Sequence, residues 1–180
     1  MISEAELERT EYGLAPRGEG WYVVNLRDAE WRHADGRGAV CVASDDFEGW
    51  RRASDQLGVN VFALSPGEPM ALYHREADQE GFLVLSGEAV LVVEGQERRL
   101  RQWDYFHCPP GTDHITIGAG EQGAAIFMLG TRSEGHRIHY PANPVAARHG
   151  ASVAESTDRA QGAYKDRPPI RPSRPPAPWG

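Results

Sequence analysis

The sequence predicts an all-β fold, a sandwich or small barrel, and two observations lead to it. Between residues 59 and 130, short apolar runs rich in branched and aromatic residues alternate with Gly, Pro and Asp. Strands this short, at nearly regular spacing, are typical of small all-β domains. In addition, no segment of this region has the helical period of 3.6 residues, which excludes a parallel α/β sheet.

Four elements are expected before this region. They are a helix over Ser3–Glu11, strands over Trp21–Leu26 and Ala39–Ala43, and a helical stretch over Phe47–Leu57. Ser3 and Glu6 have the spacing of a capping box, which favours a helix start. Asp35-Gly36 supplies turn residues between the two strands, and Gly58 ends the second helix.

The β-rich region divides into eight expected strands. They are Val59–Leu64, Met70–Glu76, Phe82–Ser86, Ala89–Val93, Glu97–Leu100, Tyr105–Cys108, Ile115–Ile117 and Ala124–Leu129. Ser86-Gly87 and Glu94-Gly95 each lie between two apolar runs, where hairpin turns are expected.

After residue 130 the β pattern weakens. A short helix is expected over Pro144–His149, and Asp158 with Gln161 resembles a capping box for another that runs to Tyr164. The segment Arg167–Gly180 is dominated by proline and arginine, so it is expected to be extended and mobile or to lie against a neighbour. The chain is thus divided into an arm (1–20), one barrel domain (21–140, with its core at 60–131) and a C-terminal extension (141–180).

Length and composition narrow the class of protein. A chain of 180 residues suits one domain with extensions, since two would both be undersized. The net charge of −7 argues against nucleic-acid binding, which needs a clustered cationic face. No apolar run reaches the roughly 20 residues of a membrane span, and no targeting segment is evident, so a cytoplasmic location is expected. Cys41 and Cys108 are expected to be free, buried thiols.

The informative side chains are two histidines and a glutamate on the expected strands. His74 ends one strand and Glu80 begins the next, while His114 directly follows the turn-forming segment Cys108–Asp113. Two imidazoles and a carboxylate that converge from three strands make a facial triad suited to Fe(II), with Mn, Ni, Zn or Co as alternatives. Three protein ligands would leave coordination positions open for water or substrate.

The spacing around these residues resembles the first motif of the cupin superfamily. In that motif a Gly is followed by His-x-His, a Glu three or four residues later, and a Gly after six more. Here Gly67 and His74 are separated by one residue more than in the motif. Glu80 follows His74, and Gly87 comes after six further residues.

The second cupin motif is also present in part. It runs from a Gly through Pro-x-Gly to a His and an Asn. This sequence has Pro109-Pro110-Gly111 and His114 in register, but Trp103 takes the first Gly position and Gly118 the Asn position. The resemblance covers roughly residues 60–131 and implies a jelly-roll β-barrel with one divalent metal inside one end.

One departure from the first motif leaves two interpretations open. Where the family has a second histidine two residues after the first, this sequence has Glu76 after His74. Because side chains alternate along a strand, both residues would face the same side, and Glu76 would act as a fourth, oxygen-donating ligand that favours Mn or Fe. Alternatively, His74 is the second family histidine, followed by a one-residue insertion, and three ligands remain.

Further residues are expected to shape the pocket. Aromatic candidates for its wall are Phe82, Trp103, Tyr105 and Phe106. Counting back from Pro109, alternation places Phe106 and Cys108 on one face and His107 on the opposite one, which brings Cys108 into the candidate pocket.

The resemblance implies several functions rather than one. A cupin with this metal centre would act on a small organic molecule as a dioxygenase, an isomerase or a decarboxylase. The alternatives are a cupin that binds or senses a small ligand without turnover, and a metal-free structural cupin. The acidic arm, the proline-rich tail and the exposed edges of a small sandwich predict a homodimer.

Overall fold

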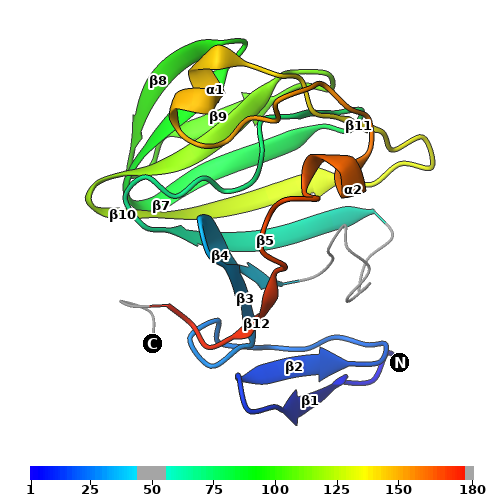
Figure 1. Cartoon of the computed structure of the whole chain (residues 1–180). Helices are drawn as coiled ribbons and strands as arrows, with labels where there is room; N and C mark the ends of the chain where they lie inside the picture. The colour runs from blue at the N-terminus through cyan, green and yellow to red at the C-terminus, as the bar shows by residue number, and fades with distance from the viewer. Residues whose placement is uncertain (44–55, 177–180) are drawn as a thin grey trace.

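The computed structural model describes residues 1–43 and 56–176 and confirms the all-β class (Figure 1). One eight-stranded antiparallel sheet has the order β12-β3-β4-β5-β10-β7-β8, with β9 on β7, and β1-β2 and β11-β6 form two separate pairs. The strands are β1 Glu6–Arg9, β2 Leu14–Arg17, β3 Trp31–Ala34, β4 Arg37–Val42, β5 Leu57–Leu64, β6 Arg75–Glu76, β7 Glu80–Val93, β8 Gln96–Arg101, β9 Tyr105–Cys108, β10 His114–Thr131, β11 Ile138–His139 and β12 Arg171–Ser173. The helices are α1 Pro144–Arg148 and α2 Ala160–Ala163.

The long strands β7 and β10 form the centre of the barrel. They pair with each other along most of their length, and the second half of β10 also pairs with β5. Buried side chains of these strands line the main core, among them Val92, Ile115, Ile117 and Ile126. The large burial of branched residues supplies the hydrophobic stabilisation of the barrel.

One of the two expected hairpin turns is confirmed and the other is wrong. Glu94 and Gly95 both have positive φ, 48° and 70°, and connect β7 to β8 as a tight hairpin. By contrast, β7 continues through Gly87, because a shift in register between β7 and β10 turns this point into a bulge. A Cβ on Gly87 would lie 2.0 Å from the carbonyl oxygen of Gly123 on β10, so the two backbones approach too closely for any side chain.

The expected elements before residue 59 are only partly confirmed. The helix over Ser3–Glu11 is wrong: the segment forms β1, which pairs with β2, because the polar run has no apolar stripe to bury as a helix. The strand over Trp21–Leu26 is reduced to an isolated bridge between Trp21 and Glu4. The strand over Ala39–Ala43 is confirmed as β4, whereas the expected helix over Phe47–Leu57 lies almost entirely outside the described residues.

The segment 70–74 is irregular, although a strand was expected there. Its backbone bonds to several parts of the chain in turn: Met70 to Thr116, Tyr73 to Ala151, and His74 to His114. Only residues 75–76 join a sheet, as β6. A strand needs one continuous partner, and this segment has a different partner at almost every step.

The C-terminal extension packs back onto the barrel. Helix α1 is confirmed and begins at Asn143, whose side chain accepts hydrogen bonds from two backbone amides. The expected capping box of α2 is wrong, since Asp158 pairs with His139 and the helix has no side-chain cap. Within the described part of the proline-rich tail, Arg171–Ser173 form the extended strand β12 beside β3 (Figure 1).

Within residues 1–43 and 56–176, no helix has the length and apolar character that a bilayer span requires.

Candidate metal centre

The strand pairing brings His114, the first residue of β10, to one end of the barrel. It follows the turn at Pro109–Thr112, where Gly111 adopts a φ of 81° and donates its backbone N–H to the carbonyl of Glu76. This bond fixes the turn against the neighbouring segment. His114 is fully buried, with only 2% of its side chain exposed.

Backbone contacts place the other two side chains beside His114. His74 and His114 form an antiparallel bridge with hydrogen bonds of 3.1 and 2.8 Å, which brings their ring centroids to 4.8 Å. Glu80, the first residue of β7, is paired with Cys108 on one side and with Gly130 on the other. One ligand atom from each of His74, Glu80 and His114 lies within 4.8 Å of the other two.

Both imidazoles are oriented by backbone carbonyls. The Nδ1 of His74 lies 2.6 Å from the carbonyl oxygen of Leu72, and the Nδ1 of His114 lies 3.0 Å from that of Thr112. A carbonyl oxygen only accepts hydrogen bonds, so each Nδ1 carries the proton and donates it. In the neutral ring, Nε2 then presents its lone pair to the cluster, as a metal-ligating histidine does.

The cluster brings acceptor atoms of different side chains close together. The Nε2 of His114 lies 3.4 Å from Oε2 of Glu80, and among the described residues that oxygen has no hydrogen-bond partner. Oε2 of the buried Glu76 is also without a partner within the described part of the chain. Buried polar atoms without a hydrogen-bond partner are rare, because their desolvation costs free energy. A cation bound between these oxygens and the histidines would offset that cost.

Burial changes the protonation of these groups. Burial, with a contribution from the neighbouring His74, lowers the pKa of His114 to about 3, which keeps its ring neutral. Burial and the nearby Glu76 carboxylate raise the pKa of Glu80 to about 8. Burial opposes ionisation of His74 as well, but the carboxylates of Glu76 and Glu80 outweigh this effect and raise the pKa of His74 above its ordinary value.

A divalent cation fits this set of donors. Two neutral Nε2 atoms and a carboxylate are the mixed nitrogen and oxygen ligands that Fe(II), Mn, Ni and Zn accept. Ion binding would also remove the main reason for the high pKa of Glu80, since it would compensate the desolvated negative charge.

Glu76 lies next to the cluster rather than within it. Its Oε1 is 3.6 Å from Nε2 of His74, and its side chain is 3% exposed. The side chain of Arg75 points the opposite way and pairs with Asp113, as strand alternation requires. Both interpretations of Glu76, a fourth ligand or a buried carboxylate beside a three-ligand site, remain compatible with this position.

The structure places only some of the expected pocket residues near the cluster. The rings of Phe82 and Phe106 stack on each other and lie 5.2 and 5.8 Å from the ring of His114. The Sγ of Cys108 is 3.5 Å from Nδ1 of His114. Trp103 and Tyr105 are instead exposed, by 68% and 57%, because Trp103 occupies a turn with positive φ and Tyr105 points outward from β9.

Two neighbours of the cluster were missed from the sequence. Tyr140 is buried, and its ring lies 5.8 Å from that of His74. Asp78 is also buried and accepts a 2.6 Å hydrogen bond from His136. Tyr140 lies outside both motifs and reaches His74 through long-range packing, whereas Asp78 lies within the first motif, between Glu76 and Glu80.

Comparisons with known proteins agree with this fold. Residues 60–130 match the family model described as a cupin domain, and no curated protein matches. Two solved structures share the fold: an RmlC-like cupin from Shewanella frigidimarina NCIMB 400 (15% identity, 65% of this chain and 96% of that chain, TM-score 0.52) and the polyketide cyclase RemF from Streptomyces resistomycificus (16%, 63% and 80%, TM-score 0.52).

A third solved structure has higher identity and a lower TM-score. It is a sugar phosphate isomerase from a cupin superfamily of Silicibacter pomeroyi DSS-3, with 26% identity, 58% of this chain covered and a TM-score of 0.49. The match covers 65% of that chain, which is less than two thirds of its length.

Proposed function

Because residues 60–130 match the cupin-domain family model, we propose that this chain is a metal-dependent enzyme that acts on a small organic molecule. The observation that carries the proposal is the convergence of the partly buried His74 with the buried Glu80 and His114, whose ligand atoms lie within 4.8 Å of one another. In both histidines Nδ1 is bound to a backbone carbonyl and Nε2 is left for the cluster, and a buried carboxylate oxygen beside them has no hydrogen-bond partner within the described part of the chain.

The proposed roles of the residues follow from their positions. His74, Glu80 and His114 would hold the metal, which would supply a Lewis acid or redox centre with open positions for oxygen atoms of a substrate. The carbonyls of Leu72 and Thr112 would keep each imidazole in the required tautomer. Phe82 and Phe106 would exclude water on the side of His114, which strengthens electrostatic interactions in the centre.

Glu76 favours an enzyme over a protein that only binds a ligand. A binding site needs metal ligands and a complementary wall, but catalysis of isomerisation or decarboxylation also needs a group that accepts or donates a proton. Glu76 is a buried carboxylate next to His74, with one oxygen that has no partner among the described residues. In the three-ligand arrangement it would be that proton-transfer group.

Metal analysis of the purified protein tests the centre. About one Fe, Mn, Ni or Zn ion per chain is expected, and a His114→Ala variant should lose it. His107→Ala is the matched control, because this histidine on β9 is exposed and is not one of the three residues whose ligand atoms converge. Metal-free wild-type protein after supplementation with each of the four ions would contradict the proposal.

Activity assays then separate turnover from binding. Dioxygen consumption with catechols and thiols, and loss or rearrangement of hydroxy acids, should reveal a substrate class that the wild-type protein converts. In that case Glu76→Gln should lower kcat while metal is retained. Binding of a small ligand without conversion under all these conditions would support the alternative of a sensing cupin.

A further inference from the structure

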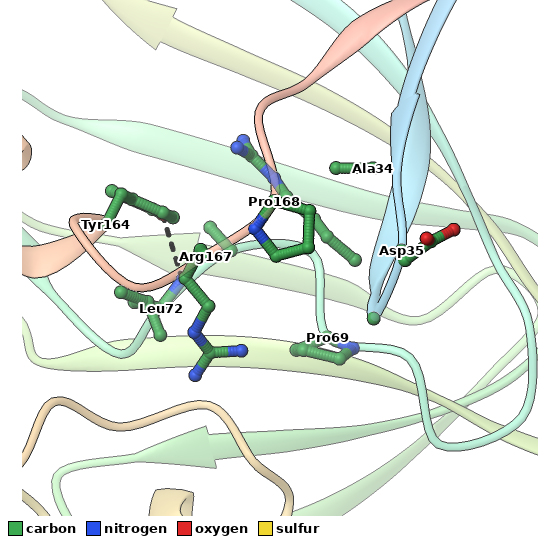
Figure 2. A pocket seen from close by; sticks show the side chains of 10 residues that line it. Ala34, Asp35, Pro69, Leu72, Tyr164, Arg167 and Pro168 are labelled. Carbon is green, nitrogen blue, oxygen red and sulfur yellow. Dashed lines mark hydrogen bonds between the residues drawn. The ribbon is translucent and has the colours of Figure 1, made fainter.

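The C-terminal extension, which lies outside the matched cupin domain, contacts the segment that carries His74. The backbone N–H of Tyr73 donates to the carbonyl of Ala151 over 2.7 Å, and the backbone N–H of Leu72 donates to the hydroxyl of Tyr164 over 3.1 Å. Figure 2 shows this second bond at a shallow pocket between the barrel and the extension, which Pro69, Leu72, Tyr164 and Arg167 help to line. The pocket contains none of the three cluster residues.

Leu72 links Tyr164 to the metal centre. Its backbone N–H is bound by the Tyr164 hydroxyl, and its carbonyl accepts the Nδ1 proton of His74 over 2.6 Å. The two groups belong to consecutive peptide units, so rotation about the Leu72 backbone would move the carbonyl away from His74. The carbonyl shares its peptide unit with the Tyr73 N–H, so the bonds to Ala151 and Tyr164, both from the C-terminal extension, hold the two peptide units on either side of Leu72.

The ring of Tyr164 is itself held in place from two directions. It meets the ring of Tyr140 edge to face at 5.8 Å, and the guanidinium of Arg37 lies 5.5 Å from its centroid. Arg37 in turn donates a hydrogen bond to the carbonyl of Met70, two residues before Leu72. These contacts fix the hydroxyl at the point where it binds the segment.

We propose that Tyr164 is a positioning residue of the metal centre, which orients His74 through the backbone of Leu72. The proposal rests on the proposed function, because it assumes that His74 binds a metal. It assigns a role to the C-terminal extension that the cupin domain alone does not supply. Loss of a hydrogen bond that orients a metal-binding side chain weakens metal binding by about 10- to 100-fold. Tyr164 acts on His74 only through Leu72, so the effect of its loss should lie at the lower end of this range.

The test compares Tyr164→Phe with wild-type protein in cobalt binding. Phenylalanine keeps the ring contacts with Tyr140 and Arg37 and removes only the hydroxyl. We expect the Kd for Co²⁺, measured by competition with a chelator, to rise about tenfold. The visible absorption of the bound Co²⁺ should change as well, because its d–d bands report the ligand geometry.

Tyr22→Phe is the matched control. It also removes a tyrosine hydroxyl that bonds to a backbone group, the carbonyl of Ala43, but in a part of the chain remote from the cluster. Its Co²⁺ affinity and spectrum should equal those of the wild type even where its melting temperature falls. A lower melting temperature in Tyr164→Phe with unchanged affinity and spectrum would reduce Tyr164 to a structural residue and overturn the proposal. Absence of Co²⁺ binding in the wild-type protein would instead refute the metal centre itself.

Discussion

After treatment with a chelator, the protein should lose stability as the pH rises from 6.5 to 8.5, because Glu80 must then ionise in a buried site without a cation. The folded protein raises the pKa of this carboxyl from 4.5 to about 8, through burial and then through the nearby Glu76. Between these two values the folded chain holds a proton that the unfolded chain has released. Stability therefore falls as the pH rises, which is the opposite of the behaviour of a salt-bridged carboxylate.

The magnitude follows from the two pKa values. Each pH unit in this interval lowers the free energy of unfolding by about 1.4 kcal/mol, and the slope flattens near pH 8. The total decrease in the free energy of unfolding between pH 6.5 and 8.5 is about 2 kcal/mol. The raised pKa of His74 adds to the fall, since a raised histidine pKa gives stability that is lost at higher pH. His114 does not contribute, because its lowered pKa of about 3 affects stability only below pH 6.5.

Urea unfolding at the two pH values, with a chelator present, measures this change. A Glu80→Gln variant carries no charge at the same position and should lose clearly less stability than the wild type over the interval. Protein loaded with a divalent metal should show no fall, since the ion binds the ionised form. An equal decrease in the wild type and in Glu80→Gln would refute the argument.

Three further predictions concern the structure around the centre. Gly87→Ala should lower the free energy of unfolding by about 2 kcal/mol or more, seen as a shift of the urea midpoint, because φ is 74° and a Cβ would meet the carbonyl of Gly123. Asn143→Ala should cost about 1 kcal/mol in the same assay, because it removes the cap of α1. Cys108, whose pKa is raised to about 12 by burial and then by Glu80, should resist iodoacetamide at pH 8 in the folded protein and react fully in urea.

The sequence predicted the β ladder well where a local pattern decides the structure. Strands Val59–Leu64 and Tyr105–Cys108 and the turn at Glu94-Gly95 are confirmed, because alternation and turn residues act over a few positions. The cluster of His74, Glu80 and His114 was predicted from motif spacing, and the structure brings its ligand atoms together.

Two of the errors arose because distant parts of the chain decided the structure. The sequence pattern around Gly87 predicts a turn, but the pairing of Gly87 with β10 makes it a bulge within one long strand. The expected strand over Met70–Glu76 is mostly irregular because its backbone bonds to separate segments. The exposure of Trp103 and Tyr105 has instead a local cause, the turn at Trp103 and the outward strand position of Tyr105. The homodimer and the cytoplasmic location stay predictions, and gel filtration tests the first.

The backbone holds the polar groups of the candidate centre in place independently of their ligand atoms. The positions of His74 and His114 are fixed by their mutual backbone bridge, and that of Glu80 by its pairing with strands on both sides. None of these backbone bonds involves the ligand atoms. The backbone contacts of the barrel therefore offset the unfavourable free energy of holding two imidazoles and two carboxylates close together. A cation would relieve that cost without moving the backbone, and the free energy released would therefore contribute to binding affinity rather than to folding.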